Sequence, residues 1–193
     1  MYFIITICFL YIIFDFNYFL RSGFTVISSR FYEKRCGLND TTTIYGFCTT
    51  QDIDILVKHM NNARFVREID FARYHFYDRT GIYDKIKKIG DIPLHVASCN
   101  RYRKSIPIFT AYKIESKMVC WEEKTFVMEH KFITLNDGFV RALVLSRQSF
   151  QKNNSDIMFK GIPGADHKPE CPEEVKHWLR AIEISSAKLR KKD

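Results

Sequence analysis

The feature that most constrains the fold of this 193-residue chain is a single amphipathic segment at residues 61–81. Its apolar residues recur at intervals of three and four positions, at Phe65, Ile69, Ala72 and Phe76. This spacing forms one apolar stripe along an α-helix, and charged residues fill other positions. Gly81 provides a stop, because glycine readily adopts the left-handed conformation found at helix ends. We therefore predict one long helix with one buried face.

Stretches with strand character lie on both sides of this helix. Residues 41–50 precede it, and four further stretches follow it, at residues 94–102, 111–121, 125–135 and 139–150. Asn136-Asp137-Gly138 separates the last two, and Asp-Gly is a strong hairpin signal. This order predicts an α+β fold in which one long central helix is wrapped by a curled antiparallel sheet. A second copy would cover a free edge of that sheet, so we also expect a homodimer.

The N-terminus begins with an apolar run of 13 residues, from Tyr2 to Phe14. We expect residues 1–22 to form an N-terminal apolar helix that acts as a membrane anchor or signal segment, although a spanning helix needs about 20 residues. Basic residues follow the run and none precedes it, which favours an uncleaved anchor with the rest of the chain in the cytosol. Secretion after cleavage of a signal peptide is the alternative.

Three further regions follow the N-terminal segment. Residues 23–40 are expected to be a linker, residues 41–150 the folded domain, and residues 151–193 a loop and a helix that starts near Pro172. The chain ends in a basic tail that resembles a dibasic retrieval signal of endoplasmic-reticulum proteins. We therefore expect a membrane-anchored protein of the endoplasmic reticulum.

Charge and cysteine spacing exclude several classes of function. The net charge is +8, but the basic residues are spread along the whole chain, so we expect no nucleic-acid partner. The six cysteines include no CxxC pair and no spacing typical of zinc ligands, so we expect no metal site. Their apolar surroundings indicate reduced cysteines in a reducing compartment.

The segment that carries chemical information is DIDILVKHMNNARF, residues 52–65. It resembles the D-x-D…H-x-N-N-x-x-[YF] signature of hotdog-fold thioesterases of the 4-hydroxybenzoyl-CoA thioesterase-like family. The chain is most similar to the thioesterase superfamily member six group, through HMNNARFVREIDFAR, SCNRYRKS and ITLNDGFVRALVLSRQ, and the likeness covers roughly residues 41–150. The resemblance implies a hotdog fold, an acyl-CoA or other acyl-thioester substrate, and no cofactor.

Thioester hydrolysis needs an activated water or nucleophile and a donor for the carbonyl oxyanion. A carboxylate placed ahead of a helix, close to the free N–H groups of its first turn, supplies both. By resemblance, Asp54 would be the general base or nucleophile, and His59 would orient or polarise the reacting groups. Asn61 and Asn62, at the helix start, would frame the oxyanion.

One departure from the signature puts this assignment in question. Asp54 lies five residues before His59, where the signature has four. A bulge would absorb the extra residue; otherwise the carboxylate is misplaced. Other roles stay open: the two asparagines as helix caps, His59 as a structural histidine, and Asp52 and Asp54 as solvated loop carboxylates. Glu68 is an alternative carboxylate, but we expect it to face away from the apolar stripe.

A basic cluster follows the first strand after the helix, at Arg101, Arg103 and Lys104. The resemblance implies that these residues bind the phosphates of coenzyme A, and a solvated basic turn is the alternative. The leading hypothesis is therefore an acyl-CoA thioesterase that acts on fatty acyl thioesters at a membrane surface. The second is a catalytically inactive hotdog protein that binds acyl lipids. A dehydratase ranks far behind, because the chain lacks the longer DPxHxD-like pattern.

Overall fold

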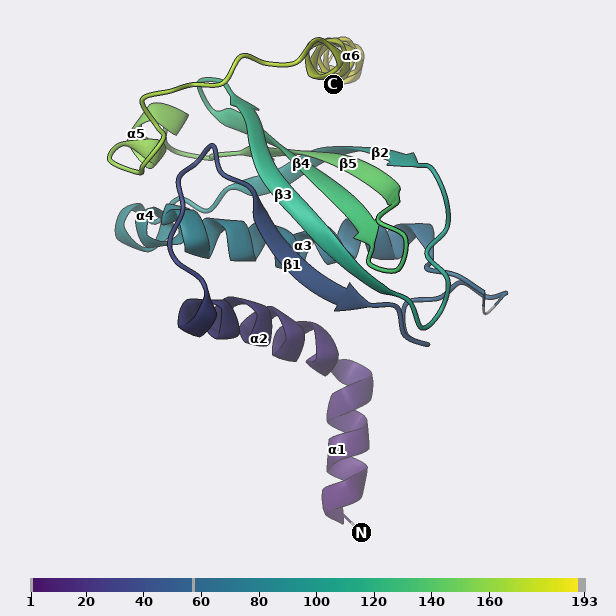
Figure 1. Cartoon of the computed structure of the whole chain (residues 1–193). Coiled ribbons are helices and arrows are strands. Elements are labelled where there is room, and N and C mark those ends of the chain that lie inside the picture. Colours follow the sequence, from purple (N-terminus) through teal and green to yellow (C-terminus); the bar gives the residue numbers. More distant parts are fainter. Residues whose placement is uncertain (1, 57, 191–193) are drawn as a thin grey trace.

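The computed structural model describes residues 2–56 and 58–190, and it is shown in Figure 1. The elements follow one another as α1 (Tyr2–Ile13), α2 (Phe16–Tyr32), β1 (Thr42–Phe47), α3 (Asn62–Thr80), α4 (Ile82–Ile89), β2 (Leu94–Tyr102), β3 (Ala111–Trp121), β4 (Thr125–Thr134), β5 (Val140–Ser149), α5 (Ser155–Phe159) and α6 (Glu173–Arg190). The last residues of the expected basic tail, 191–193, lie outside the described ranges.

The five strands form one antiparallel sheet in the order β1-β3-β4-β5-β2. α3 lies across one face of the curled sheet, which confirms the predicted arrangement of one long helix and one antiparallel sheet (Figure 1). β2 and β3 begin and end at the predicted residues, and β4 and β5 do so within one residue. β1 and β2 are the two edges of the sheet.

The apolar stripe of α3 forms the centre of the core. Phe65, Ile69, Ala72 and Phe76 are each at most 2% exposed. Phe65, Ile69 and Ala72 pack against inward-facing residues of three strands, among them Tyr112, Ile114, Phe132, Ala142 and Val144. Phe76 packs in the neighbouring cluster with Met118, Phe126 and Met128. Burying a large apolar side chain contributes about 1.5–3 kcal/mol, so this stripe fixes α3 on the sheet.

α3 ends where the sequence predicts, but a second helix follows at once. Gly81 has φ +87°, a left-handed conformation that ends α3, and it is also the residue before α4. α4 was not predicted, although Ile82, Ile86 and Ile89 recur at intervals of four and three residues, which is typical of a helix. Its buried residues Ile82 and Ile86 extend the core beyond α3.

The N-terminal region differs from the expected organisation. α2 continues to Tyr32, so the first ten residues of the expected linker 23–40 are helical. The helix begins after Asp15, whose carboxylate accepts a hydrogen bond from the Tyr18 N–H. α2 packs against α3 through ion pairs rather than through a continuous apolar seam, as the next subsection describes. No helix within the described ranges combines the length and the apolar character needed to cross a membrane.

The opposite face of the sheet is covered by α6, which was predicted to start near Pro172 and starts at Glu173. Val175 and Leu179 of α6 are buried against outward-facing residues of three strands, among them Val119, Val127 and Leu145. The sheet is therefore packed on both faces, by α3 on one and by α6 on the other (Figure 1).

Candidate functional site

The loop before α3 brings the predicted carboxylate and imidazole together. Ile53 and Met60 form an isolated antiparallel bridge, and the Asp54 N–H donates to the His59 carbonyl at 3.0 Å. This closure places Asp54 opposite His59, with 3.5 Å between a carboxylate oxygen and Nδ1. The side chains are 17% and 42% exposed, so both are accessible from solvent. The five-residue spacing therefore does not separate the pair.

Asp52, the other carboxylate of the motif, has a structural position. It is 2% exposed, and its carboxylate accepts hydrogen bonds from the N–H and hydroxyl of Thr49 at 2.8 and 2.9 Å. Arg64 of α3 donates to it at 2.5 Å. The Asp52 carbonyl accepts from the Asn61 N–H at 2.8 Å. Asp52 thus fastens the loop to the first turns of α3, and it is not a solvated loop carboxylate.

The two asparagines at the start of α3 have different positions. Asn61 is the N-cap, and its side-chain oxygen accepts from the Ala63 N–H at 2.9 Å. Such a cap stabilises a helix by about 1 kcal/mol. Asn62 is the first residue of α3, and its carbonyl accepts a hydrogen bond from the Tyr102 hydroxyl at 3.0 Å. That bond joins the start of the helix to the end of β2.

A pocket of about 260 Å³ lies where the end of β2 meets the start of α3. It is lined by residues of both segments: His59, Met60, Asn62, Phe65, Tyr102, Arg103, Lys104 and Ser105. The structure therefore brings two of the predicted catalytic residues, His59 and Asn62, to the same pocket as two of the predicted phosphate-binding residues. Asp54 lies behind His59 and Asn61 caps the helix; neither lines the pocket.

The basic residues of this pocket are held by the neighbouring hairpin. The Arg103 guanidinium stacks 4.7 Å from the centroid of the Phe139 ring and donates to the Val140 carbonyl at 3.2 Å. The Lys104 ammonium lies 5.9 Å from the same ring. Arg101 is exposed on β2 and does not line the pocket. Two cations at one pocket rim suit an anionic group such as a phosphate.

The expectation that Glu68 faces away from the apolar stripe is wrong. Its side chain is fully buried. Both of its oxygens accept from Arg21 of α2, at 2.6 and 2.5 Å, and one also accepts from the Tyr112 hydroxyl at 2.7 Å. Burial raises the pKa of the Glu68 carboxyl, and the charge of Arg21 opposes that shift. The reason for the error is that α3 buries a second face, against α2, which periodicity in α3 alone does not reveal.

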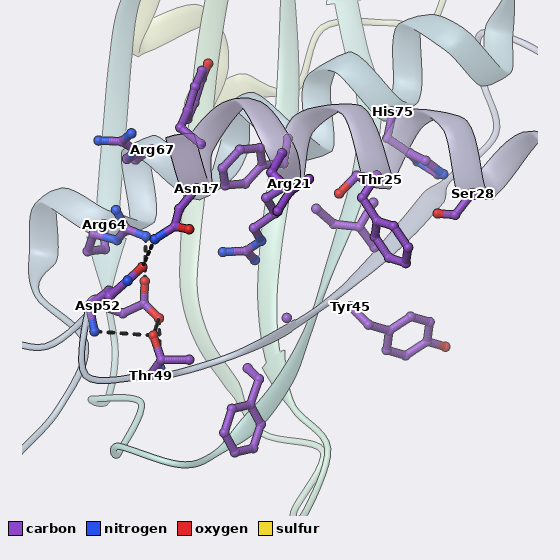
Figure 2. Close-up of a pocket in the computed structure, with 18 of the residues that line it drawn as sticks. Asn17, Arg21, Thr25, Ser28, Tyr45, Thr49, Asp52, Arg64, Arg67 and His75 are labelled. Atoms are coloured by element: carbon purple, nitrogen blue, oxygen red, sulfur yellow. Dashed lines mark hydrogen bonds and ion pairs between the residues drawn. The ribbon is translucent and has the colours of Figure 1, made fainter. Parts of the chain in front are cut away.

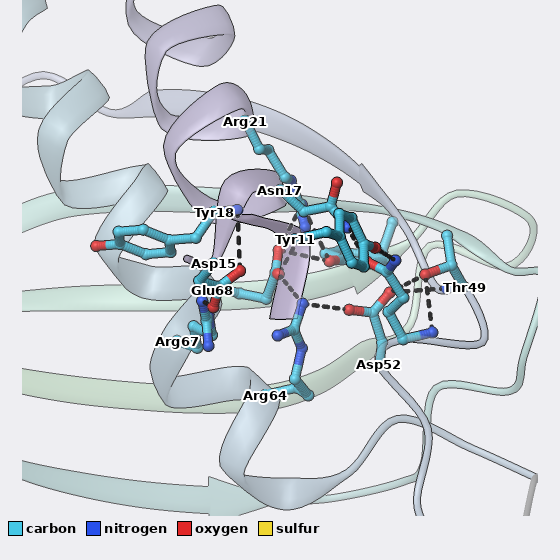
Figure 3. Close-up of polar contacts among 12 residues, drawn as sticks. Tyr11, Asp15, Asn17, Tyr18, Arg21, Thr49, Asp52, Arg64, Arg67 and Glu68 are labelled. Atoms are coloured by element: carbon cyan, nitrogen blue, oxygen red, sulfur yellow. Dashed lines mark hydrogen bonds and ion pairs between the residues drawn. The ribbon is translucent and has the colours of Figure 1, made fainter. Parts of the chain in front are cut away.

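Figure 3 shows how this buried carboxylate belongs to a larger set of polar contacts between α2, α3 and the loop. Arg64 lies between Asp52 and Glu68, 3.6 Å from the latter. Arg67 forms an ion pair with Asp15, the N-cap of α2. These contacts explain why α2 is ordered against α3 although most of its apolar residues face outward.

A separate groove of about 1030 Å³ lies between α2, β1 and α3 (Figure 2). Arg21, Asp52, Arg64 and Arg67 lie along it, and Phe24, Phe47 and Phe71 are among its apolar lining residues. It shares no residue with the smaller pocket at His59. Arg64 and Arg67 are paired with Asp52 and Asp15, and Arg21 is paired with the buried Glu68.

Tyr102, Arg21 and Tyr112 are polar residues near these two sites that were not predicted from the sequence. Tyr102 was next to the predicted basic cluster, and its ring packs against Phe65 with centroids 5.2 Å apart. Within the described part of the chain, no three His, Cys, Asp or Glu residues are grouped so that they could hold a metal ion.

Comparison with protein families and with known proteins finds thioesterase-like relatives of this chain. Residues 48–179 match the family model described as the thioesterase-like superfamily. Protein THEM6 of Drosophila melanogaster is 49% identical over 188 residues, covering 97% of both chains. Protein THEM6 of Xenopus laevis is 33% identical over 177 residues, covering 91% of this chain and 85% of its relative.

Solved structures share the fold at much lower sequence identity. The 4-hydroxybenzoyl-CoA thioesterase of Pseudomonas sp. strain CBS-3 superposes with a TM-score of 0.52 at 15% identity, covering 57% of this chain and 84% of that chain. The gentisyl-coenzyme A thioesterase BH1999 gives a TM-score of 0.51 at 16% identity, covering 56% and 88% of the two chains. At this identity the likeness establishes the fold.

Proposed function

Because the chain belongs to the thioesterase-like superfamily, we propose that it hydrolyses fatty acyl-CoA thioesters at a membrane surface. The observation that carries this proposal is the single pocket where His59 and Asn62 meet Arg103 and Lys104. These residues come from two separate segments, 59–62 and 103–104, one suited to acyl transfer and the other to phosphate binding. Neither segment alone would provide both the acyl-transfer groups and the phosphate-binding groups that a thioester of coenzyme A needs.

In the proposed reaction, the Asp54 carboxylate takes a proton from a water molecule that attacks the thioester carbonyl carbon. His59, 3.5 Å from that carboxylate, orients the water and polarises the reacting groups. The Asn62 N–H stabilises the oxyanion, because the N–H groups of Asn61 and Ala63 already donate to other acceptors. The carbon–sulfur bond then breaks, and the coenzyme A thiolate leaves with a proton returned by the base. Arg103 and Lys104 hold the phosphates of the leaving group.

A second copy of the chain would complete the site. The pocket at His59 is smaller than the 300–1000 Å³ typical of sites for organic ligands, and a fatty acyl chain does not fit within it. Tyr102, Arg103 and Lys104 of this pocket stand at the end of β2, an edge strand that pairs on one side with β5. A homodimer joined along β2 would extend the pocket and cover the exposed edge.

The outer face of α2 supports the membrane part of the proposal. Its large apolar residues are each 57–78% exposed, at Phe16, Phe19, Leu20, Phe24, Ile27 and Phe31. Apart from the adjacent Phe19 and Leu20 they recur every three or four residues, so they form one exposed stripe along α2. α1 precedes this stripe with an apolar sequence of 12 residues, about 18 Å long, which is short for a bilayer core of about 30 Å. We therefore propose that α1 enters the bilayer of the endoplasmic reticulum while α2 lies along its cytosolic surface.

The second candidate function is an acyl-binding protein without turnover. It is favoured by one observation: the Asp54 carboxylate lies behind His59 and does not itself line the pocket. In this case the same pocket and the same basic residues would bind an acyl thioester that is not cleaved.

Release of free coenzyme A from a panel of acyl-CoA esters tests the proposal. The full chain, purified in detergent, should release the thiol from at least one fatty acyl-CoA. Arg103→Ala should raise the Michaelis constant by roughly tenfold, as expected for the loss of a charged contact of about 1.5 kcal/mol. Lys131→Ala, which removes a cation that does not line the pocket, is the matched control. Saturable binding of acyl-CoA without release of thiol would instead support the binding protein.

A further inference from the structure

Two cysteine sulfurs meet at the sheet face that is opposite α3. Sγ of Cys120, in β3, and Sγ of Cys171, just before α6, are 2.8 Å apart although 51 positions separate them in sequence. Cys120 is 2% exposed, and Cys171 is half-buried. Both are free thiols in the structure.

A bulge in β3 directs Cys120 toward Cys171. The register between β3 and β4 shifts between Met118 and Cys120. Met118 and Trp121 pack into the core under α3, whereas Val119 and Cys120 both pack on the side of α6. A regular strand would turn Cys120 to the α3 side, because successive side chains alternate between faces. The bulge thus makes the contact between the two sulfurs.

α6 has few other attachments to the domain. Val175 and Leu179 are buried against the sheet, and Trp178 and Ile182 are partly buried there. Farther along the helix, Ile184 and Leu189 are 52% and 66% exposed. In the described part of the chain, the hydrogen bonds and ion pairs of α6 side chains stay within α6 and the residues just before it. The thiol pair sits at the one end of α6 that is packed.

From this geometry we propose that Cys120 and Cys171 form an intramolecular disulfide when the protein meets a small-molecule disulfide such as oxidised glutathione. The bond fastens the start of α6 to β3. A disulfide places its sulfurs about 2.05 Å apart, so a relative movement of less than about 1 Å closes the bond. The crosslink closes a loop that contains β4, β5 and α5, and it therefore restricts the unfolded chain as well as α6.

The reaction proceeds in two thiol–disulfide exchanges. The thiolate of Cys171, the more exposed of the two, attacks one sulfur of oxidised glutathione and releases one glutathione thiolate. Cys120 then loses its proton to solvent and attacks the Cys171 sulfur of the mixed disulfide, which releases the second glutathione. In sum, two protein thiols and one oxidised glutathione give one protein disulfide and two reduced glutathiones. Burial raises the pKa of the Cys120 thiol, so the second exchange is slower and speeds up with rising pH.

Peptide mapping of the oxidised full chain tests this proposal. The protein is incubated with oxidised glutathione, quenched with acid, alkylated in denaturant and digested with trypsin without reduction. Trypsin releases Cys120 in residues 118–124 and Cys171 in residues 161–176, because the Lys168–Pro169 bond resists cleavage. We expect the two peptides joined, with a mass 2 Da below their sum. Cys99, exposed on β2, shows in the same sample that the oxidant has reacted.

The matched variants are Cys171→Ser, which should lose the crosslink, and Cys99→Ser, which should keep it. Hydrogen exchange in α6 should slow on oxidation of the wild type and of Cys99→Ser, and it should not change in Cys171→Ser. The proposal is overturned if Cys99 carries glutathione while Cys120 and Cys171 are both alkylated. A predominant crosslink between other cysteines, or oxidation that leaves exchange in α6 unchanged, overturns it too.

Discussion

Replacing Arg21 with methionine isolates what the buried pair with Glu68 contributes to stability. The Glu68 side chain is fully buried, and Arg21 satisfies both of its oxygens. The variant leaves this carboxylate with the hydrogen bond from the Tyr112 hydroxyl and with Arg64 at the longer distance of 3.6 Å. Removing one partner of a buried ion pair costs about 3–5 kcal/mol. The Arg21 side chain is 29% exposed, so water can partly replace it, and we expect a loss of about 2–3 kcal/mol.

Urea denaturation of the full chain at neutral pH measures this loss. Arg67→Met is the matched control, because it removes the partner of Asp15 in an ion pair whose side chains are 35% and 48% exposed, and it should cost less than about 1 kcal/mol. The double variant Arg21→Met/Glu68→Met should recover most of the loss, since no unpaired charge is then buried. Equal losses in Arg21→Met and Arg67→Met would refute the reasoning, because the buried carboxylate would then not need its partner.

Three further predictions concern other parts of the molecule. Gly46→Ala should lower the free energy of unfolding by at least about 1–3 kcal/mol in a denaturation experiment, because its Cβ would come within 2.4–2.6 Å of the buried Tyr112 side chain. The control Gly23→Ala, with no neighbour within 4 Å, should not destabilise the protein. Burial and nearby Arg73 lower the pKa of His130 to about 3. The free energy of unfolding should therefore fall by up to about 5 kcal/mol as the pH falls from 6.5 toward 3, and it should fall less in His130→Gln. Neither Asn39 nor Asn153, both in glycosylation sequons, should carry a glycan in cells; a glycan on either, detected as a glycosidase-sensitive shift on a gel, would place the domain in the lumen.

The parts of the fold that the sequence predicted are those where one local pattern decides the outcome. Strands β2 and β3 follow from β-branched and aromatic stretches bounded by polar turns, and α3 follows from one stripe with a glycine stop. α2 could not be predicted in this way. Its apolar residues face outward, and the contacts that hold it are charged pairs with α3, which exist only once both helices have formed.

The candidate site shows the same division. The residues of the pocket at His59 all lie in or beside predicted motifs. The reason is that the start of a helix and the end of a strand can both be recognised from a short stretch of sequence. The separate roles of Asp52 and Asp54 were not visible. The bridge between Ile53 and Met60, together with Arg64 one turn into α3, buries the first carboxylate and leaves the second beside His59. Gly46 gave a usable signal, since glycine inside a strand marks a close approach by another group, here Tyr112.

The measurement that tests hydrolysis at this site most directly compares coenzyme A release by Asp54→Asn and Asp52→Asn with that of the wild type. Asp54→Asn keeps the size of the side chain and removes the proposed base, so we predict a loss of at least about a hundredfold in turnover, with the protein still folded. Asp52→Asn should instead lower the unfolding midpoint, because it weakens the bonds to Thr49 and Arg64. Turnover in folded Asp54→Asn equal to that of the wild type would contradict the proposed mechanism.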